Sequence, residues 1–429
     1  MKFYSIMSVA CLSMMLSGWV WAEEVDLIES EDLSKLIEKQ LVHEERFGAF
    51  LDECDLVAKS GKKDYMLSKI DTIADEHFED STDSYLEGYI QALVDVHYYE
   101  FNVGVYVNDR KVTLYNLPNN ALLTNSIVTF VENLPEVQSV AKGETITDEE
   151  EEEKEQHIIR KQVNGIWFPQ STVVFQPLIA DPREPLYSAD FRYGDHIMGK
   201  YSIGVSLGDT FPIFRWRNVF HWKGDLQIDI QAGVWSVFKM GAYDNPNHEI
   251  SELVNTDYLV GIPLSYAVNR WSFRYRIYHI SSHLGDEFLV NHPGFVRKNP
   301  SMEAMDLITS YQVTDGIRLY FGPGWVMHSD DTYKLKPFYI EWGGEFRHFG
   351  HLSYYHRIYG TPFLAIFVSN WQTNHWQFSL NSQLGYEWSK LQGVGRKVRV
   401  YIGYYNGYSE GQFFKERTSY GTCGFSYGF

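Results

Sequence analysis

A histidine and a serine two residues apart stand out in residues 271–283, which read WSFRYRIYHISSH. Apolar and polar side chains alternate from Trp271 to Ile277, so this stretch predicts a β-strand with one apolar face. The same alternation puts His279 and Ser281 on the apolar face, where polar groups are costly unless they are paired. Residues two apart on one face of a strand are separated by about 7 Å, within reach of an imidazole and a hydroxyl. An imidazole that takes the hydroxyl proton prepares a serine to attack an acyl ester, and we predict these roles for the pair.

A third group should hold the imidazole, and Glu303 is the first candidate. The next predicted strand carries apolar residues at alternate positions from Met305 to Val313, and Glu303 shares their parity. Neighbouring strands lie about 4.8 Å apart, so Glu303 can meet His279 across a hairpin if the register is right. Asn291 and Asp286, in the connection between the two strands, are the fallback candidates.

Two other interpretations of this stretch stay open. In the first, the strand ends near Ile277 and the following residues form an ordered loop, in which the Gly285-Asp286 turn needs no catalytic role. In the second, His279 and His283 bind a metal, but in an extended strand they would lie about 13 Å apart. The loop is therefore the main competitor of the catalytic interpretation.

A His-x-Ser motif on the apolar face of a strand resembles the motif of outer-membrane phospholipase A and of the lipid A deacylase barrels. The resemblance is local, and Ser282 stands where those families usually have an asparagine. It implies a membrane-embedded serine hydrolase that acts on acyl esters of phospholipid or lipid A. No organic cofactor is expected, and calcium is the one ion to test for such a hydrolase.

Alternation of apolar and polar residues continues through much of the chain after Trp167, as in residues 200–207, 225–234, 376–388 and 397–404. Long strands of this kind suit a tilted crossing of a bilayer, and aromatic residues cluster at their ends. No stretch holds 18 consecutive apolar residues, which argues against helical membrane spans. We predict a mainly β protein in which residues 166–429 form an antiparallel transmembrane β-barrel of about 12 strands. A soluble sandwich is the alternative.

The C-terminus favours the barrel. The chain ends in CGFSYGF, with Phe429 last and apolar residues two, four and six places before it. This ending resembles the sorting signal of outer-membrane barrels and implies the barrel-assembly machinery as a partner of Phe429. The same alternation turns Cys423 toward lipid.

The polar faces of the strands would fill the barrel interior. Their charges nearly cancel, which favours a narrow, filled barrel over a pore selective for one sign of charge. The predicted interior residues are Lys200, Arg274, Arg276, Arg318, Arg347, Lys397 and Arg399, with Asp225, Asp229, Asp306, Glu341, Glu345 and Glu387.

The N-terminal part of the chain differs from the rest in its charge. Residues 23–160 carry 33 acidic and 12 basic side chains, and the whole chain has a net charge of −19, so the remainder is close to neutral. Such acidity excludes nucleic acid as a partner. We predict a secretory signal peptide over residues 1–22, a helical segment over 23–80 and an acidic, solvated linker over 146–165.

Residues 81–145 predict a small α+β domain. A helix is followed by two strands that meet at Asn108-Asp109, a helix capped by Asn119 or Asn120, and a last short strand. With the stretches VYVNDRKVTLYNLP and VENLPEVQSV, this order resembles the BON domain of periplasmic proteins. The resemblance implies docking to phospholipid or to a periplasmic protein, and an unrelated α+β domain is the alternative.

The C-terminal part also resembles an uncharacterised family of bacterial envelope proteins, first described from chlamydiae. The matching stretches include ADPREP from Ala180, RIYHISSHLGDEFL from Arg276, SMEAMDLITSY from Ser301 and YYNGYSEGQFF from Tyr404. The resemblance implies an envelope protein but no particular reaction. The expected protein is an outer-membrane β-barrel in contact with outer-membrane lipid, with a periplasmic docking domain and no assigned activity. The serine acyl hydrolase is the alternative.

Overall fold

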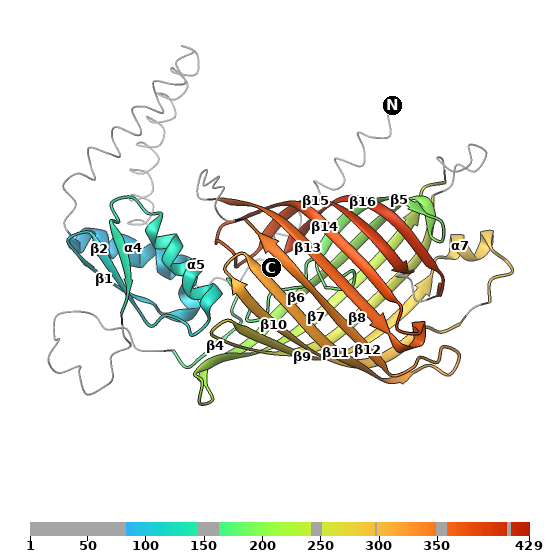
Figure 1. Cartoon of the computed structure of the whole chain (residues 1–429), viewed down its shortest axis with the longest axis horizontal. Coiled ribbons are helices and arrows are strands. Elements are labelled where there is room, and N and C mark those ends of the chain that lie inside the picture. The colour runs from blue at the N-terminus through green and yellow to red at the C-terminus, as the bar shows by residue number, and fades with distance from the viewer. Residues whose placement is uncertain (1–82, 144–162, 242–250, 297, 349–357, 410–412) are drawn as a thin grey trace, which may run out of the picture. The chain divides into compact units, whose positions relative to one another are not determined.

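The computed structural model describes residues 83–143, 163–241, 251–296, 298–348, 358–409 and 413–429. The predicted signal peptide, the helical segment of residues 23–80 and most of the acidic linker lie outside the described residues. Figure 1 shows a small α+β region followed by a β-barrel, and residues from Ser81 to Phe429 belong to one compact unit.

The α+β region has the predicted order of elements. They are α4 (Asp83–Tyr98), the 3-10 helix η2 (Tyr99–Phe101), β1 (Gly104–Asn108), β2 (Lys111–Tyr115), α5 (Ala121–Glu132) and β3 (Ser139–Lys142). The tight β1–β2 turn places Asp109 and Arg110 at positive φ, as a two-residue hairpin requires. Asn120 caps α5, because its side-chain oxygen accepts a hydrogen bond of 3.2 Å from the amide of Leu123. Strand β3 pairs in parallel with β2, and leucine, isoleucine and valine side chains of both helices fill the core between helices and sheet.

Hydrogen bonds join the α+β region to the first strands of the barrel. The amide of Ala121 donates to the carbonyl of Asn269 at 2.8 Å, and Asn269 lies in the turn between β8 and β9. Glu100 forms a fully buried ion pair of 2.8 Å with Arg215 of β6. The α+β region thus contacts one end of the barrel.

Twelve antiparallel strands form the closed barrel, as the sequence predicted. They are β5 (Tyr187–Asp195), β6 (Gly199–Val219), β7 (Gly224–Lys239), β8 (Glu252–Val268), β9 (Trp271–Leu284), β10 (Ser301–Thr314), β11 (Ile317–Ser329), β12 (Phe338–Arg347), β13 (Tyr359–Trp371), β14 (Phe378–Ser389), β15 (Lys397–Tyr408) and β16 (Arg417–Gly428). Each strand pairs with its neighbour in the chain, and β16 closes the ring on β5. The short β4 (Gly165–Trp167) pairs with the far end of β6. Each of the twelve strands thus pairs with a neighbour on both sides, as a barrel in a membrane requires.

Side chains alternate between the two faces of the wall. Leu207, Ile230, Ile262, Leu319 and Ile402 point outward and are exposed, as an apolar surface in contact with lipid requires. Exposed aromatic side chains near strand ends include Trp271, Phe338, Phe378, Trp388 and Tyr427. Cys423 is also exposed, which confirms its predicted direction. The helices after the α+β region are short: α7 (Asp286–Asn291) and η4 (Gln372–Asn374). No helix in the described ranges is both long and apolar enough to cross a membrane.

The interior is charged and largely paired. Arg276 binds Asp306 at 2.6 Å, and Arg347 binds both Glu345 and Glu387. Of the thirteen predicted interior residues one was wrong: Lys200 is exposed, because it lies at the end of β6 and its ammonium packs over the ring of Tyr201. Two fully or almost fully buried arginines of β6, Arg215 and Arg217, were not predicted.

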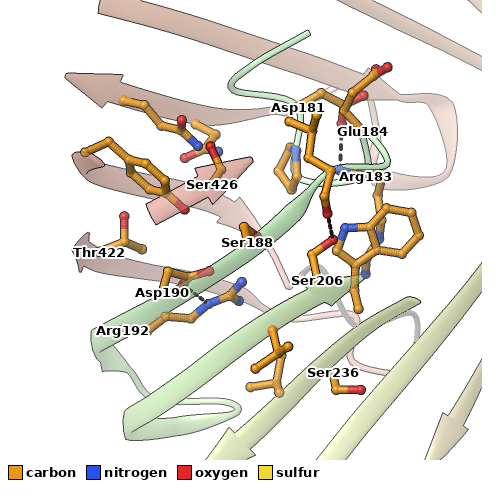
Figure 2. A pocket seen from close by; sticks show the side chains of 18 of the residues that line it. Asp181, Arg183, Glu184, Ser188, Asp190, Arg192, Ser206, Ser236, Thr422 and Ser426 are labelled. Carbon is orange, nitrogen blue, oxygen red and sulfur yellow. Dashed lines mark hydrogen bonds and ion pairs between the residues drawn. The ribbon is translucent and has the colours of Figure 1, made fainter. Parts of the chain in front are cut away.

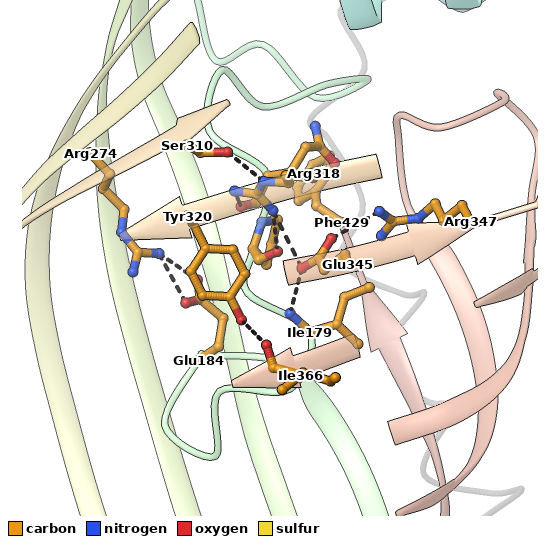
Figure 3. Close-up of polar contacts among 12 residues, drawn as sticks. Ile179, Glu184, Arg274, Ser310, Arg318, Tyr320, Glu345, Arg347, Ile366 and Phe429 are labelled. Atoms are coloured by element: carbon orange, nitrogen blue, oxygen red, sulfur yellow. Dashed lines mark hydrogen bonds and ion pairs between the residues drawn. The ribbon is translucent and has the colours of Figure 1, made fainter. Parts of the chain in front are cut away.

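A segment before the first barrel strand fills part of the interior. Residues 168–186, called the lumen segment below, were predicted as part of the barrel wall, but the first barrel strand begins at Tyr187. Phe175, Leu178 and Ile179 pack against inward side chains such as Ile308 and Ala365. Figure 3 shows how charges hold this segment: Arg274 binds Glu184, and Glu345 accepts a hydrogen bond from the amide of Ile179. Arg318 donates to the carbonyl oxygens of Gln176 and Pro177. The predicted filled barrel is therefore filled by side chains and by a length of main chain.

The two ends of the barrel differ. At the end that contacts the α+β region, the turns at residues 220–223, 269–270 and 315–316 have two to four residues, although the connections at 348–358 and 390–396 are longer, and we call it the turn end. At the other end the connection at residues 196–198 is short, whereas those at 285–300, 330–337 and 409–416 have eight or more residues, and we call it the loop end. Phe429 finishes β16 at the turn end and is 2% exposed, because its ring packs beneath Arg396. The last residue therefore does not continue the lipid-facing row of Cys423, Phe425 and Tyr427.

Candidate functional site on the outer wall

The predicted pair lies on the outer face of β9, near the loop end. Tyr278, Ile280 and Ser282 of this strand are buried in the interior, which leaves His279 and Ser281 on the outer wall. The strand continues to Leu284, so the interpretation in which it ends near Ile277 is wrong. Ser282 donates a hydrogen bond to Asp257 inside the barrel and cannot join a site outside.

The register of β9 and β10 brings Glu303 directly opposite His279. The Nδ1 atom of His279 lies 2.8 Å from Oε1 of Glu303, a hydrogen bond in which the imidazole N–H donates. The side chains of both residues remain about half exposed on the outer wall, 45% for His279 and 41% for Glu303. The contact predicted between these two residues is confirmed, whereas their catalytic roles stay a prediction.

A second histidine completes this contact. His328 of β11 lies on the other side of Glu303, and its Nδ1 is 2.7 Å from Oε2. The carboxylate thus accepts one hydrogen bond on each oxygen from imidazoles of the two neighbouring strands. Alternation along β11 predicts His328 inside, because Val326 is buried and Met327 exposed. A β-bulge between β10 and β11 at this point turns His328 outward as well.

Ser281 lies two residues beyond His279 on β9, toward the loop end. It is opposite Ser301 of β10 and Tyr258 of β8, and its side chain is partly exposed on the same outer face as His279. Among the described residues no hydrogen bond joins the Ser281 hydroxyl to His279. Because Glu303 binds Nδ1, the free ring atom of His279 is Nε2, and this atom is the one available to a serine hydroxyl.

The fallback residues and the metal interpretation receive no support from contacts. The side chain of Asn291 donates to Glu252 at 2.7 Å, and Asp286 is exposed in the first turn of α7. His283 packs edge-on against Tyr258, with 5.5 Å between ring centroids. Within the described parts of the chain, no group of three or more histidine, cysteine or acidic side chains is arranged to hold a metal ion.

His279 and Glu303 belong to a longer row across the outer wall. Strand pairing aligns one residue from each of six consecutive strands, and we call this the outer row: Asp209, Ala232, Val260, His279, Glu303 and His328. Asp209, at its far end, is paired with Arg396 at 2.8 Å. Ala232 and Val260, the two positions next to His279, are apolar and form the apolar part of the row, whereas the other four positions are polar.

A groove follows the apolar part of the outer row from Asp209 to His279. Its volume is about 410 Å³, and Ala232 with the backbone of Gly208 and Gly233 lies at its base. Larger side chains border it, namely Tyr187, Leu207, Phe211, Val234, Tyr258 and Val260, and Asp209, which is paired with Arg396, also lines it. We call it the outer groove. A small side chain between larger neighbours explains the depression, and its position on the lipid-facing wall explains its apolar lining.

Comparison with known families identifies the chain over most of its length. The family described as "Protein of unknown function (DUF1207)" matches residues 100–429. The chain belongs to this family. No sequence relative is found among curated proteins. The family match covers the last part of the α+β region as well as the barrel.

Solved structures share the barrel architecture at low identity. Outer membrane phospholipase A from Escherichia coli is 14% identical, with a TM-score of 0.38 over 60% of this chain and 98% of that chain. The KdgM porin is 13% identical, with a TM-score of 0.31 over 56% and 99% of the two chains. The transport unit of the autotransporter AIDA-I from Escherichia coli is 9% identical, with a TM-score of 0.30 over 60% and 95%. These likenesses concern the outer-membrane type of barrel alone and assign no residue a role.

Proposed function

We propose that this protein is a serine acyl hydrolase whose catalytic residues lie on the outer wall of its barrel. The observation that carries the proposal is the 2.8 Å contact between His279 and Glu303 on a face that otherwise favours apolar side chains. A carboxylate, an imidazole and a serine on adjacent positions of one face are the parts that acyl transfer needs.

The chemistry follows from the ring atoms. Glu303 accepts the Nδ1 proton, so Nε2 of His279 carries the lone pair and acts as the base. Nε2 takes the proton of the Ser281 hydroxyl while Oγ forms a bond to the ester carbonyl carbon. The bond from that carbon to the alcohol oxygen then breaks, and His279 returns the proton to the leaving alcohol. Water repeats the sequence on the acyl-serine and releases a fatty acid.

The outer groove supports a lipid as the substrate. It leads along the apolar part of the outer row to His279, so an acyl chain in the groove would end near the catalytic pair. Ala232 and His279 lie two inter-strand spacings apart, a span of about 10 Å that several methylene groups would fill. The substrate class is therefore a long-chain acyl ester of a membrane lipid, phospholipid or lipid A.

We also propose a location and orientation. In outer-membrane barrels short turns face the periplasm and longer loops face outward. By this rule the turn end and the α+β region are periplasmic, and the catalytic pair lies toward the outer leaflet. The α+β region would then dock a periplasmic protein or phospholipid, and Phe429 with its preceding aromatic residues would engage the barrel-assembly machinery.

The decisive test is the release of acyl chains by purified, refolded protein. Mixed phospholipids and lipopolysaccharide are supplied with and without calcium, and free fatty acids are measured by mass spectrometry. Ser281→Ala should reduce release at least about 10³-fold, because no acyl-serine can form. Ser382→Ala is the matched control, since Ser382 is an outward serine of β14 on another part of the wall. No release by the wild type under any condition, or equal release by Ser281→Ala, would rule the hydrolase out.

A further inference from the structure

A second cavity lies inside the barrel, between the lumen segment and the loop end. Its volume is about 180 Å³, which is room for about six water molecules. Asp181, Pro182 and Arg183 of the lumen segment form one side. Inward side chains of the wall and residues of the loop-end connections, including Tyr333 and Lys415, form the rest. We call it the inner cavity.

One carboxylate in the inner cavity lacks a partner. Glu341 of β12 is 8% exposed, and its Oε2 atom is buried without a hydrogen bond from any described residue. The nearest arginines of the lining have acidic partners: Arg276 pairs with Asp306 at 2.6 Å, and Arg183 pairs with Asp257. Leaving a buried carboxylate without a counter-charge is strongly destabilising.

The charge of the whole lining points the same way. Apart from the two paired arginines, the lining holds Asp181 and Glu341 against Lys415. Asp181 accepts a hydrogen bond from the amide of Arg183, and Lys415 packs over the ring of Tyr333 at 4.4 Å. Outside its ion pairs, the inner cavity is therefore lined by one more acidic group than basic groups.

A smaller neighbouring cavity shows the contrast. It shares Asp181 and Arg183 with the inner cavity and has a volume of about 70 Å³. Figure 2 shows its carboxylate Asp190 bound by Arg192, at 2.7 Å. There the charge is satisfied within the protein, whereas at Glu341 it is not.

Aromatic rings in fixed positions form much of the inner cavity wall. The hydroxyls of Tyr278 and Tyr339 are 2.8 Å apart, and the ring of Tyr339 stacks on Trp371 with 4.2 Å between centroids. Tyr405 stacks on Tyr420 at 5.1 Å. These contacts hold Tyr278, Trp371 and Tyr405 in place around the cavity.

We propose that the inner cavity binds a small organic ammonium compound. A positive charge on the ligand would compensate Glu341, and its carbon substituents would contact the faces of the aromatic rings, which attract cations. A neutral ligand of the same shape would fill the cavity but leave the carboxylate uncompensated. The site is separate from the outer wall, so it does not depend on hydrolase activity.

Choline and its uncharged isostere 3,3-dimethylbutan-1-ol test this proposal by calorimetric titration of the full chain refolded in detergent. We expect saturable binding of choline at one site and at least about tenfold weaker binding of the isostere. Glu341→Gln keeps the shape and removes the charge, and it should weaken choline binding by a similar factor. Trp371→Leu removes a ring and should also weaken binding.

Asp229→Asn is the matched control, because Asp229 is a buried interior carboxylate that does not line the inner cavity. It should leave choline binding unchanged, and heat-modifiability reports that each variant is folded. If Glu341→Gln does not fold, Trp371→Leu and the isostere still decide. The proposal is overturned if choline does not bind, if the isostere binds equally well, if the folded cavity variants bind as the wild type does, or if Asp229→Asn loses binding as they do.

Discussion

The two faces of strand β9 handle polar groups in opposite ways. Inside, Arg274 and Arg276 are almost fully buried and bind Glu184 and Asp306 through short ion pairs. Outside, His279 and Glu303 are joined by one hydrogen bond and stay about half exposed on an apolar wall. The Arg274–Glu184 pair holds the lumen segment and the Arg276–Asp306 pair joins two neighbouring strands, whereas the outer group leaves Nε2 of His279 without a hydrogen bond among the described residues. A polar group with an unbonded nitrogen on a lipid-facing wall is suited to act on a lipid, whereas ion pairs buried inside the barrel are suited to stabilise the fold.

The largest effect should come from breaking an inner pair. Arg274→Met leaves Glu184 buried without its arginine, which should lower the free energy of unfolding by about 3–5 kcal/mol. The measurement is urea-dependent folding of the barrel in vesicles, and loss of heat-modifiability gives a second reading. Arg270→Met is the control, because Arg270 is exposed at the turn before β9 and should cost far less. Equal stability of Arg274→Met and the wild type would contradict the structural role of the inner pairs.

Removing the outer carboxylate should affect activity and leave the fold intact. Glu303→Gln keeps the size of the side chain but removes the negative charge that stabilises the protonated imidazole of His279. We expect acyl release to fall by about 10²-fold, on the scale of general-base catalysis. Glu416→Gln, an exposed glutamate outside the outer row, should release acyl chains at the wild-type rate. A Glu303→Gln protein that is fully active would remove Glu303 from the site.

Filling the outer groove should separate long substrates from short ones. Ala232→Phe places a ring at the base of the groove, so hydrolysis of a long-chain lipid should fall by about tenfold, as expected when a binding contact of one to two kcal/mol is lost. Hydrolysis of a short, soluble ester should change little, because it does not need the groove. Val400→Phe adds the same bulk at an exposed outward position of β15. If both substrates are affected alike, the groove does not bind the acyl chain.

The smallest effect is expected at His328. His328→Gln removes the hydrogen bond that the imidazole donates to Glu303. Such a bond has a net contribution of about 1 kcal/mol, or roughly fivefold in rate. The loss should appear in kcat with KM unchanged, since His328 positions Glu303 and does not touch the substrate. His283→Gln, on the same outer wall but outside the outer row, is the control. A change in KM alone would indicate a role in lipid binding instead.

Local alternation and capping determined much of this protein from its sequence. The period of two fixed which residues of β9 and β10 face outward, because side-chain direction in a strand depends only on the residue's own position. The same reasoning produced the twelve-stranded barrel and placed His279, Ser281 and Glu303 on one face. The α+β order followed from helix and strand periods and from the cap at Asn120. Each of these features depends on residues that are close together in the sequence.

Only the tertiary structure decided the remaining features, because each depends on partners distant in the chain. The lumen segment has no strand or helix period, and it lies inside because Arg274, Arg318 and Glu345 bind it there. Alternation alone assigns His328 to the interior, but a bulge in the pairing of β10 with β11 turns it outward. Phe429 is buried beneath Arg396 from another connection. The 2.8 Å contact of His279 with Glu303 likewise depends on strand register. Alternation places both residues on the outer face, but only the pairing of β9 with β10 sets them opposite each other.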